Sequence, residues 1–410
     1  MDTGGDATQT AVRMATWPGS TADRREPSAP AERWSPLPWR KRLKNGLIAV
    51  LVRGVLAFAA RLPGRAAIGL GAWLGRLAGR LAGSERRRVE RQLGAALGLD
   101  ERSSEVRRLS LAVFDHLGRS AGELAWAWRS ADRVRELVRF APGALETMRR
   151  RATGGRGVLF VTGHIGNWEL LAWAVQVAGI PSASVGRRSY DPGLTELIDR
   201  WRRRWGALAL WRESPRVGSE IEDAVERGIS VGILIDQAVE LPSVPIPFFG
   251  RPARTVVGPA LLALARRIPV VVGWIRRRPD GLHVVEIEDS APPAAAPQPQ
   301  AAGAIASAWT AAWTATLERA IRDEPEQWVW MHRRWDPEAG GALLREQRIG
   351  GLESRGQRLI RPGCRLERRR GRRQDGQGRD SAGTAAAGAT LSPAVVSTEI
   401  SSSSSRARLS

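Results

Sequence analysis

The sequence of 410 residues contains one cysteine, Cys364, and only four histidines, at positions 116, 164, 283 and 332. A single cysteine cannot form an intrachain disulfide, and histidines this far apart lack the spacing of Cys/His metal sites. Low cysteine use is typical of proteins in a reducing compartment. We therefore expect neither a metal nor a cofactor in this protein.

The chain also lacks a long uninterrupted apolar run. It lacks the charged-then-apolar start of a cleaved signal peptide too, because its first thirty or so positions are largely polar. Its most apolar stretch extends from Gly46 to Ala60 and is interrupted by Arg53. A membrane span needs about 20 apolar residues, and an Arg at its centre costs about 2.5–3.5 kcal/mol on insertion scales. The stretch predicts a helix lying in one leaflet after the basic segment 39–42, with a true span as the close alternative.

Acidic residues are too few to balance the basic ones, since 42 Asp and Glu face 63 Lys and Arg and the net charge is +21. Such an excess predicts an anionic partner, and nucleic acid, an anionic membrane surface and an acidic carrier protein all qualify. The 17 Trp and the single Tyr help to choose among them. Trp favours the bilayer interface, where its apolar ring and its N–H are both accommodated. We therefore expect a membrane partner and no nucleic acid.

Both ends of the chain are poor in periodic apolar residues. Residues 1–36 are rich in Thr, Ser, Pro, Gly and Ala, and residues 341–410 form a basic and then Ser-rich tail, so we expect both to be disordered. Residues 37–84 predict a membrane-associated helical segment. In that segment a smooth helix face suited to close packing is formed by four glycines at four-residue spacing, namely Gly71, Gly75, Gly79 and Gly83.

Residues 85–340 form the main domain, in which helices are followed by an alternation of strands and helices. Residues 85–150 have helical periodicity, and strands are then predicted at 157–162, 182–185, 229–235, 270–274 and, as an edge strand, 283–287. Helices are predicted between and after them, at 170–178, 196–204, 220–227, 258–266 and 301–322. This alternation predicts an α/β fold with a mixed or parallel sheet flanked by helices.

His164 follows the first predicted strand by one glycine and precedes a predicted helix. Ligands of open α/β sheets bind at the carboxyl ends of strands. Glu169 lies in the first turn of that helix, and a carboxylate that holds one imidazole nitrogen makes the other nitrogen a better base. The pair is thus a candidate for deprotonating a substrate hydroxyl. The alternative is a surface histidine near a helix cap, with Glu169 favouring the helix dipole.

Three blocks of sequence resemble the late acyltransferases of lipid A biosynthesis. The first block is Gly163-His164-Ile165-Gly166-Asn167-Trp168-Glu169. The second is Gly232-Ile233-Leu234-Ile235-Asp236-Gln237, followed by Pro247-Phe248-Phe249-Gly250 and Thr255-x-x-Gly258-Pro259-Ala260. The third is Pro325-Glu326-Gln327-Trp328-Val329-Trp330-Met331-His332-Arg333-Arg334-Trp335. The blocks occur in family order and spacing, and the resemblance covers residues 40–337.

The resemblance implies the α/β core of glycerolipid-type acyltransferases, which places an acyltransferase domain at 85–340. It implies a fatty acyl thioester as donor, on acyl carrier protein or coenzyme A, and a hydroxyl of an anionic glycolipid as acceptor. His164 matches the family's general base and Glu169 the carboxylate that holds it. Asp236 and Gln237 match the family's Asp-Gln pair, and Arg188 lies near a family Arg on the acceptor side.

Further substrate-binding candidates come from the same blocks. Asn167 caps the helix after His164. Phe248 and Phe249 would line an acyl-chain groove or close the core. Arg333 and Arg334 lie between tryptophans, which suits either a phosphate at the lipid interface or packing on the core.

Arg251 and Arg254 are additional candidates for binding phosphates of the acceptor. Asp236 ends a buried strand, the same topological position as His164, which predicts that it lines the same cleft; the alternative is that it caps the following loop. We expect His332 to pack within the aromatic block rather than to catalyse, and His116 and His283 to be structural.

The sequence therefore predicts an acyltransferase at the cytoplasmic face of the bacterial inner membrane, acting on a lipid A precursor without a covalent acyl-enzyme. A different glycolipid, a lysophospholipid or an aminolipid is an alternative acceptor. The rivals from other classes are a nucleic-acid-binding protein with a basic tail and a membrane scaffold without catalysis.

Overall fold

The computed structural model of the protein describes residues 54, 57–187, 202, 206–238, 241–293 and 302–335. The chain divides into two units, and every described residue belongs to the first, Met1–Arg361. Several sequence predictions lie outside the described residues: Arg188, most of Gly46–Ala60, most of the helix at 196–204, and the two ends predicted to be disordered.

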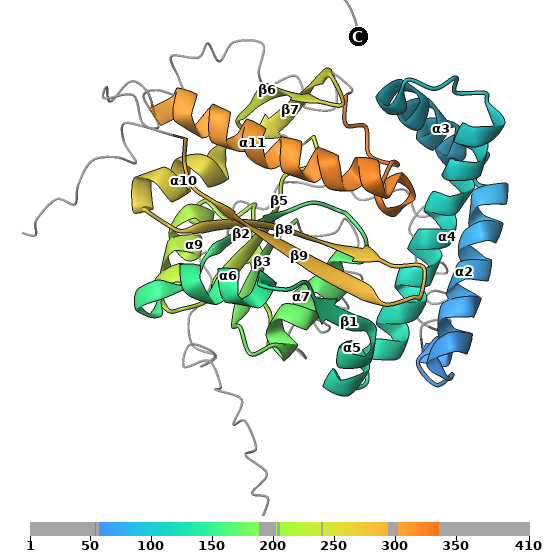
Figure 1. The fold of residues 1–410 in the computed structure, drawn as a ribbon, viewed down its shortest axis with the longest axis horizontal. Coiled ribbons are helices and arrows are strands. Elements are labelled where there is room, and N and C mark those ends of the chain that lie inside the picture. Colours follow the sequence, from blue (N-terminus) through green and yellow to red (C-terminus); the bar gives the residue numbers. More distant parts are fainter. Residues whose placement is uncertain are drawn as a thin grey trace, which may run out of the picture. The chain divides into compact units, whose positions relative to one another are not determined.

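A mixed seven-stranded sheet forms the centre of the described fold (Figure 1). Its strand order is β1-β9-β8-β2-β5-β3-β4, and all neighbours are parallel except β8 and β9. The strands are β1 (Val138–Phe140), β2 (Leu159–Thr162), β3 (Ser182–Gly186), β4 (Leu208–Trp211), β5 (Ser230–Leu234), β8 (Val270–Arg277) and β9 (His283–Ser290). The predicted α/β fold with a mixed sheet is confirmed.

The strand that begins at His283 is not an edge strand, so that prediction is wrong. Strand β9 lies between β8 and the short strand β1. Its alternating pattern arises because one face of the strand is packed and the other is half-exposed, as in Val285, Ile287 and their neighbours. The sequence contains no comparable signal for β1, which has only three residues.

Helices cover both faces of the sheet. Helices α5 (Ala131–Leu137), α6 (Ala144–Arg151) and α7 (Trp168–Val177) pack on one face, and α9 (Val217–Glu226), α10 (Gly258–Arg266) and α11 (Ala302–Asp323) on the other. Successive residues of a strand point to opposite faces. In β2, Leu159 and Val161 therefore belong to one core and Phe160 to the other.

Three further helices, α2 (Gly64–Leu81), α3 (Gly83–Leu97) and α4 (Ser104–Ala127), precede the sheet. Helices α2 and α4 lie side by side (Figure 1) because glycines let their backbones approach. A Cβ atom on Gly71 would lie 2.2 Å from the Gly118 carbonyl oxygen, and one on Gly75 equally close to that of Phe114. The predicted packing face is confirmed for these glycines. No helix within the described residues is both long and apolar enough to cross a bilayer.

A two-stranded antiparallel hairpin, β6 (Ser243–Phe248) and β7 (Arg251–Val256), lies beside α11. Phe249 and Gly250 form its two-residue turn with φ angles of 53° and 69°. Two positive φ angles match the twist of a tight hairpin. The turn thereby places two phenylalanines of the second sequence block next to each other.

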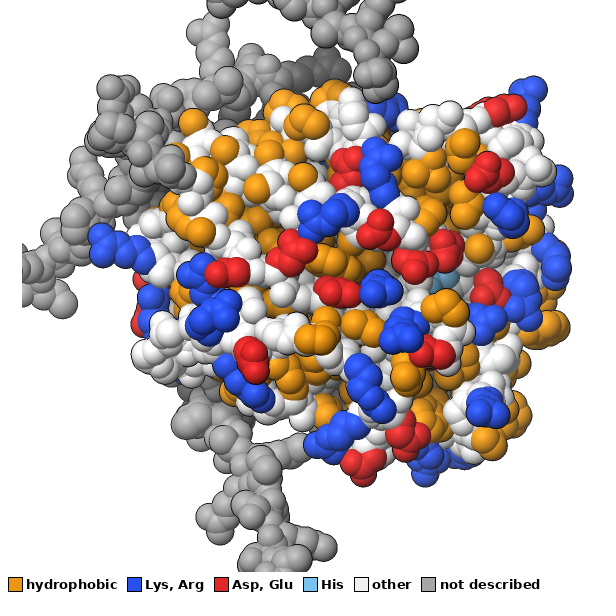
Figure 2. Space-filling model, in the orientation of Figure 1, with side chains coloured by type: hydrophobic (Ala, Val, Ile, Leu, Met, Phe, Trp, Pro, Cys, Tyr) orange, Lys and Arg blue, Asp and Glu red, His pale blue; other side chains and the backbone are white. Residues whose placement is uncertain are grey.

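Charged side chains of both signs are interspersed on the face shown in Figure 2. Arg319 pairs with Glu288 and Arg151 with Asp289, which joins α11 and α6 to strand β9. Exposed ion pairs of this kind contribute little to stability. The described residues of this face thus carry charges of both signs side by side.

Candidate active site

The candidate site forms where two neighbouring strands end. Strands β2 and β5 are parallel, and Thr162 is paired with Leu234. His164 and Asp236 each follow these partners by two residues, so equal register brings them to the same edge of the sheet. The prediction that Asp236 lines the same cleft as His164 agrees with this geometry.

His164 and Asp236 are joined by two hydrogen bonds. The His164 Nδ1 atom lies 2.8 Å from Asp236 Oδ1, and the His164 backbone N–H donates to Oδ2 at 2.5 Å. The side chain of Asp236 is 2% exposed, whereas that of His164 is 19% exposed. Burial alone would raise the pKa of Asp236, but the His164 ring and the hydrogen bonds from His164 and Trp328 hold it well below its usual range. Asp236 is therefore a carboxylate that fixes the orientation of a partly open imidazole.

The third sequence block completes the setting of Asp236. Trp328 donates from Nε1 to Asp236 Oδ2 at 2.8 Å and forms a backbone bridge with Ile165. The Gly166 N–H donates to the Gln327 carbonyl at 2.7 Å. The segment after α11 thus holds both the histidine loop and the carboxylate that orients it.

Two glycines of the first block permit this close packing. A Cβ atom on Gly163 would lie 2.9 Å from Asp236 Oδ2. Gly166 has a φ of 59°, and a Cβ atom there would lie 2.0 Å from the Ile275 carbonyl oxygen. Any larger side chain would displace the loop from Asp236 or from strand β8.

Gln237 and His332 also lie beside the His164 ring. The Gln237 Nε2 atom is 2.8 Å from His164 Nε2, 3.1 Å from His164 Nδ1 and 2.6 Å from His332 Nε2. The two imidazole rings are 5.5 Å apart. Burial, followed by the charge of His164, lowers the pKa of His332 to about 4, so this second imidazole is neutral at physiological pH. Sequence reasoning placed His332 in the packing of its block and missed this proximity.

Glu169 is in contact with a different group. Its Oε1 atom lies 2.6 Å from Arg202 Nη2, and the two side chains are 24% and 15% exposed. In the structure the carboxylate on His164 is thus Asp236, and Glu169 forms an ion pair from the first turn of α7. The role that the sequence block implies for Glu169 stays a prediction.

The other predicted substrate-binding residues divide into buried and exposed groups. Asn167 is buried, caps α7 by accepting from the Leu170 N–H, and donates to Glu123 Oε2 at 3.0 Å. Arg334 is also buried and donates to Thr255 Oγ1 and to the Arg254 carbonyl. Both side chains therefore have partners within the protein. Arg333 is exposed.

Phe248 and Phe249 belong to an aromatic cluster with three tryptophans, Trp328, Trp330 and Trp335. Phe248 is 1% exposed and lies edge-on to Trp328, which contacts Asp236. Arg251 lies over the Trp335 ring at the border of the cluster. The two phenylalanines therefore close the core behind the site.

An apolar cavity lies on the α7 side of the sheet. Its lining includes Trp168, whose ring meets that of His164 edge-on at 5.1 Å between centroids. The remaining lining residues are Met148, Phe160, Thr162, Leu171, Ala172, Val175, Ser182, Ala183, Ser184, Ser230, Gly232 and Leu234. The lining is mainly apolar and includes the hydroxyl groups of Thr162 and three serines, and mainly apolar linings with a few polar groups are typical of ligand sites.

A partly exposed imidazole oriented by a buried carboxylate, beside an apolar cavity, suits an enzyme that activates a hydroxyl next to a hydrocarbon substrate. The chain belongs to the bacterial lipid A biosynthesis acyltransferase family, whose sequence model matches residues 39–336. It is similar to the lipid A biosynthesis lauroyltransferase of Escherichia coli (strain K12). The two are 29% identical over 304 residues, which is 71% of this chain and 92% of that protein. The protein is thus an acyltransferase, as the three blocks predicted.

Proposed function

We propose that the protein transfers a fatty acyl group from an acyl thioester to a hydroxyl of a lipid A precursor. Family membership supports the acyltransferase activity and the class of acceptor. The observation that carries the mechanism is the hydrogen bond of 2.8 Å between His164 Nδ1 and Asp236 Oδ1. It leaves the opposite nitrogen, Nε2, for the substrate.

The reaction moves one proton in two steps, from the acceptor hydroxyl to His164 and from His164 to the leaving group, and it needs no covalent enzyme intermediate. His164 Nε2 takes the proton of the acceptor hydroxyl while its oxygen attacks the thioester carbonyl, and Asp236 stabilises the imidazolium that forms. The C–S bond then breaks, and the imidazolium returns the proton to the leaving thiolate. The products are an ester and a free thiol, so no co-reactant is needed.

The Gln237 amide marks the place of the substrate hydroxyl, since its Nε2 atom lies 2.8 Å from His164 Nε2. A hydroxyl that binds there displaces the amide. The displaced N–H is then close enough to donate to the oxygen on which negative charge develops, as in an oxyanion hole.

The cavity beside Trp168 has a volume of about 50 Å³, so the acyl chain of the donor enters it only if the lining side chains move apart. The relative is named as a lauroyltransferase. We propose that this protein likewise transfers a saturated fatty acyl group. The net charge of +21 favours an acidic acyl carrier protein as the carrier of the acyl group.

We also propose that the protein works at the cytoplasmic face of the inner membrane, attached through its N-terminal helices. On α2, Trp73 and Leu81 are 54% and 76% exposed, on the side opposite the glycines that face α4. Arg65 and Arg80 of the same helix are also exposed. Exposed apolar and basic side chains on one helix suit insertion into the headgroup region of an anionic leaflet.

Mass spectrometry of lipid A from cells with and without the gene tests the proposal. We expect one acyl chain to be missing without the gene and to return when the wild-type gene is supplied. The H164A variant should lose about 10²–10⁴-fold of the activity and still sediment with anionic vesicles. Unchanged lipid A with altered phospholipids or aminolipids would redirect the acceptor, and a fully active H164A variant would refute the mechanism.

A further inference from the structure

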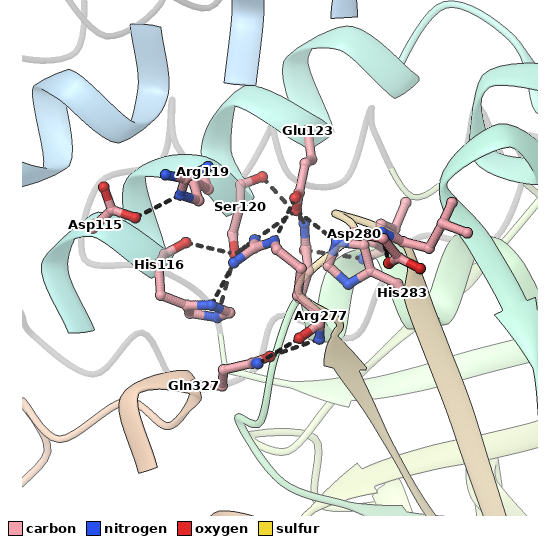
Figure 3. Close-up of polar contacts among 12 residues, drawn as sticks. Asp115, His116, Arg119, Ser120, Glu123, Arg277, Asp280, His283 and Gln327 are labelled. Carbon is pink, nitrogen blue, oxygen red and sulfur yellow. Dashed lines mark hydrogen bonds and ion pairs between the residues drawn. The ribbon is translucent and has the colours of Figure 1, made fainter. Parts of the chain in front are cut away.

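A buried charged network lies behind the His164 loop (Figure 3). Its centre is Glu123 on α4, whose side chain is 1% exposed. Glu123 accepts two hydrogen bonds from Arg277, at 2.7 and 2.9 Å, and lies 3.0 Å from His283 Nε2. Burial alone would raise the pKa of Glu123, but His283 and Arg277 hold it well below its usual range. Glu123 is therefore a charged group in the interior.

Arg277 joins this carboxylate to the end of strand β8. Its guanidinium also contacts His116 Nδ1 at 2.6 Å and donates to Ser120 Oγ at 3.0 Å. Its backbone N–H and carbonyl are both paired with the side-chain amide of Gln327, at 2.7 and 2.8 Å. Arg277 thereby fixes Gln327 relative to the sheet from two directions.

The network is attached to the residues that directly follow His164. Glu123 accepts from the Asn167 amide at 3.0 Å, and Asn167 also donates to the Ser120 carbonyl at 3.2 Å. Gln327 accepts from the Gly166 N–H through its own carbonyl at 2.7 Å. Gly166 and Asn167 are therefore both held by side chains or backbone groups of residues that contact the buried Glu123–Arg277 pair.

We propose that Glu123 and Arg277 form a positioning pair, which sets the His164 loop through Asn167 and Gln327 and so fixes the reach of the imidazole toward its substrate. This inference rests on the proposed role of His164 as the base. Neither member of the pair touches the reacting atoms. Their effect reaches the reaction through the placement of Gly166 and Asn167.

Stability alone does not account for such a pair. Replacing a buried ion pair by apolar residues of similar volume is often neutral or stabilising, whereas removing one partner is strongly destabilising. A misplacement of about 1 Å near reacting groups costs on the order of 10²-fold in rate. The pair therefore has more influence on turnover than on folding.

The double variant E123M/R277M removes both charges at once and avoids an unpaired buried ion. We expect its kcat, measured below its melting temperature with the acyl thioester and a lipid A precursor, to fall about 10–100-fold. KM should change by less than about twofold, because binding surfaces are retained. A wild-type kcat, or a change confined to KM, would overturn the proposal.

Two single variants separate positioning from general destabilisation. N167S keeps a side chain that caps helices well but is too short to reach Glu123, so its loss of kcat should not add to that of the double variant. S290A removes the acceptor of the Trp309 and Trp313 N–H groups, far from the loop. S290A should lower the melting temperature and leave kcat unchanged. Additive losses, or an equal loss in S290A, would refute the positioning role.

Hydrogen exchange gives a readout that needs no substrate. The amide of Gly166 and its neighbours should exchange about tenfold faster in E123M/R277M than in the wild type, with no change in S290A. If the wild type shows no acyl transfer but the exchange result holds, the proposed function has failed and the structural coupling has not. Unchanged exchange in the double variant would refute the coupling itself.

Discussion

Two histidine–carboxylate pairs of the described residues differ first in the exposure of the imidazole. At the open pair, His164 is 19% exposed and Asp236 is 2% exposed. At the sealed pair, His283 is 0% exposed and Glu123 is 1% exposed. Both carboxylates are held ionised in the interior. Only the open imidazole has a nitrogen that substrate can reach, so exposure of the ring, not the presence of a carboxylate, distinguishes a reactive pair from a positioning network.

The carboxylates also differ in their donors. Asp236 accepts hydrogen bonds from His164 and from the Trp328 N–H. Glu123 accepts from the guanidinium of Arg277, which binds both of its oxygens. Glu123 therefore shares its charge among Arg277, Asn167 and His283. Asp236 has no arginine among these contacts, and both of its oxygens face His164.

The largest effect should come from removing the charge at the open pair. D236N can accept only one of the two hydrogen bonds from His164 and no longer stabilises the imidazolium. We expect kcat to fall about 10²–10⁴-fold. Steady-state kinetics with the acyl thioester at saturating acceptor measures this fall.

E169Q is the matched control, because it also removes one carboxylate charge next to the same loop. Glu169 is paired with Arg202 rather than with His164, so we expect a fall in kcat of about tenfold or less. A fall in E169Q as large as that in D236N would restore Glu169, the residue that the sequence block implies, as the carboxylate of the base.

A smaller effect should follow from W328F. The substitution keeps an aromatic ring but removes the N–H that donates to Asp236 at 2.8 Å. We expect kcat to fall roughly tenfold, and the free energy of unfolding to fall by about 1–3 kcal/mol because the smaller ring leaves a cavity. W309F is a control of equal size change in the α11 core, and it should lose stability without the loss of kcat. An equal fall in kcat for both variants would contradict the role of Trp328.

Much of this site was predictable because the chemistry is local in sequence. His164 follows a buried strand with only Gly163 between them, and its glycines, its cap and the helix that follows are contiguous. The strand of Asp236 was also recognisable, and parallel pairing of the two strands is enough to bring these side chains together. The fold class followed from the same alternation of buried strands and helices.

The partners of these residues were not predictable in the same way. Glu123 lies on an arginine-rich helix and meets Arg277, which is 154 positions away in sequence. No local pattern distinguishes that glutamate from a solvated one. The spacing between His164 and Glu169 predicted a contact within one loop, but strand register brought Asp236 to the ring instead. Contacts set by tertiary packing of distant segments leave no periodic signal.

His116, which contacts Arg277 in the sealed network, should reveal itself through the pH dependence of stability. Burial, followed by the charge of Arg277, lowers the pKa of His116 to about 3. Between pH 6.5 and 5 the unfolded chain therefore binds a proton at this position and the folded protein does not, so the free energy of unfolding falls as the pH falls. H116Q removes this protonation site from the unfolded chain. The slope of the free energy of unfolding against pH should therefore decrease by up to about 1.4 kcal/mol per pH unit. Urea unfolding at several pH values in this window measures the slope.

Between pH 6.5 and 5 the measured slope reports on histidines, because the buried carboxylates change the free energy of unfolding only at lower pH. Asp236 and Glu123 also have lowered pKa values, but the stability they contribute is lost only as the pH falls below about 4, the usual range of carboxyl groups. His332 remains in the H116Q variant and retains its own slope of the same sign, since its pKa is about 4. Equal slopes for the wild type and H116Q would show that His116 is protonated in the folded protein. A proton there would face Arg277 at 2.6 Å, and the sealed network would then carry a charge that the described contacts do not balance.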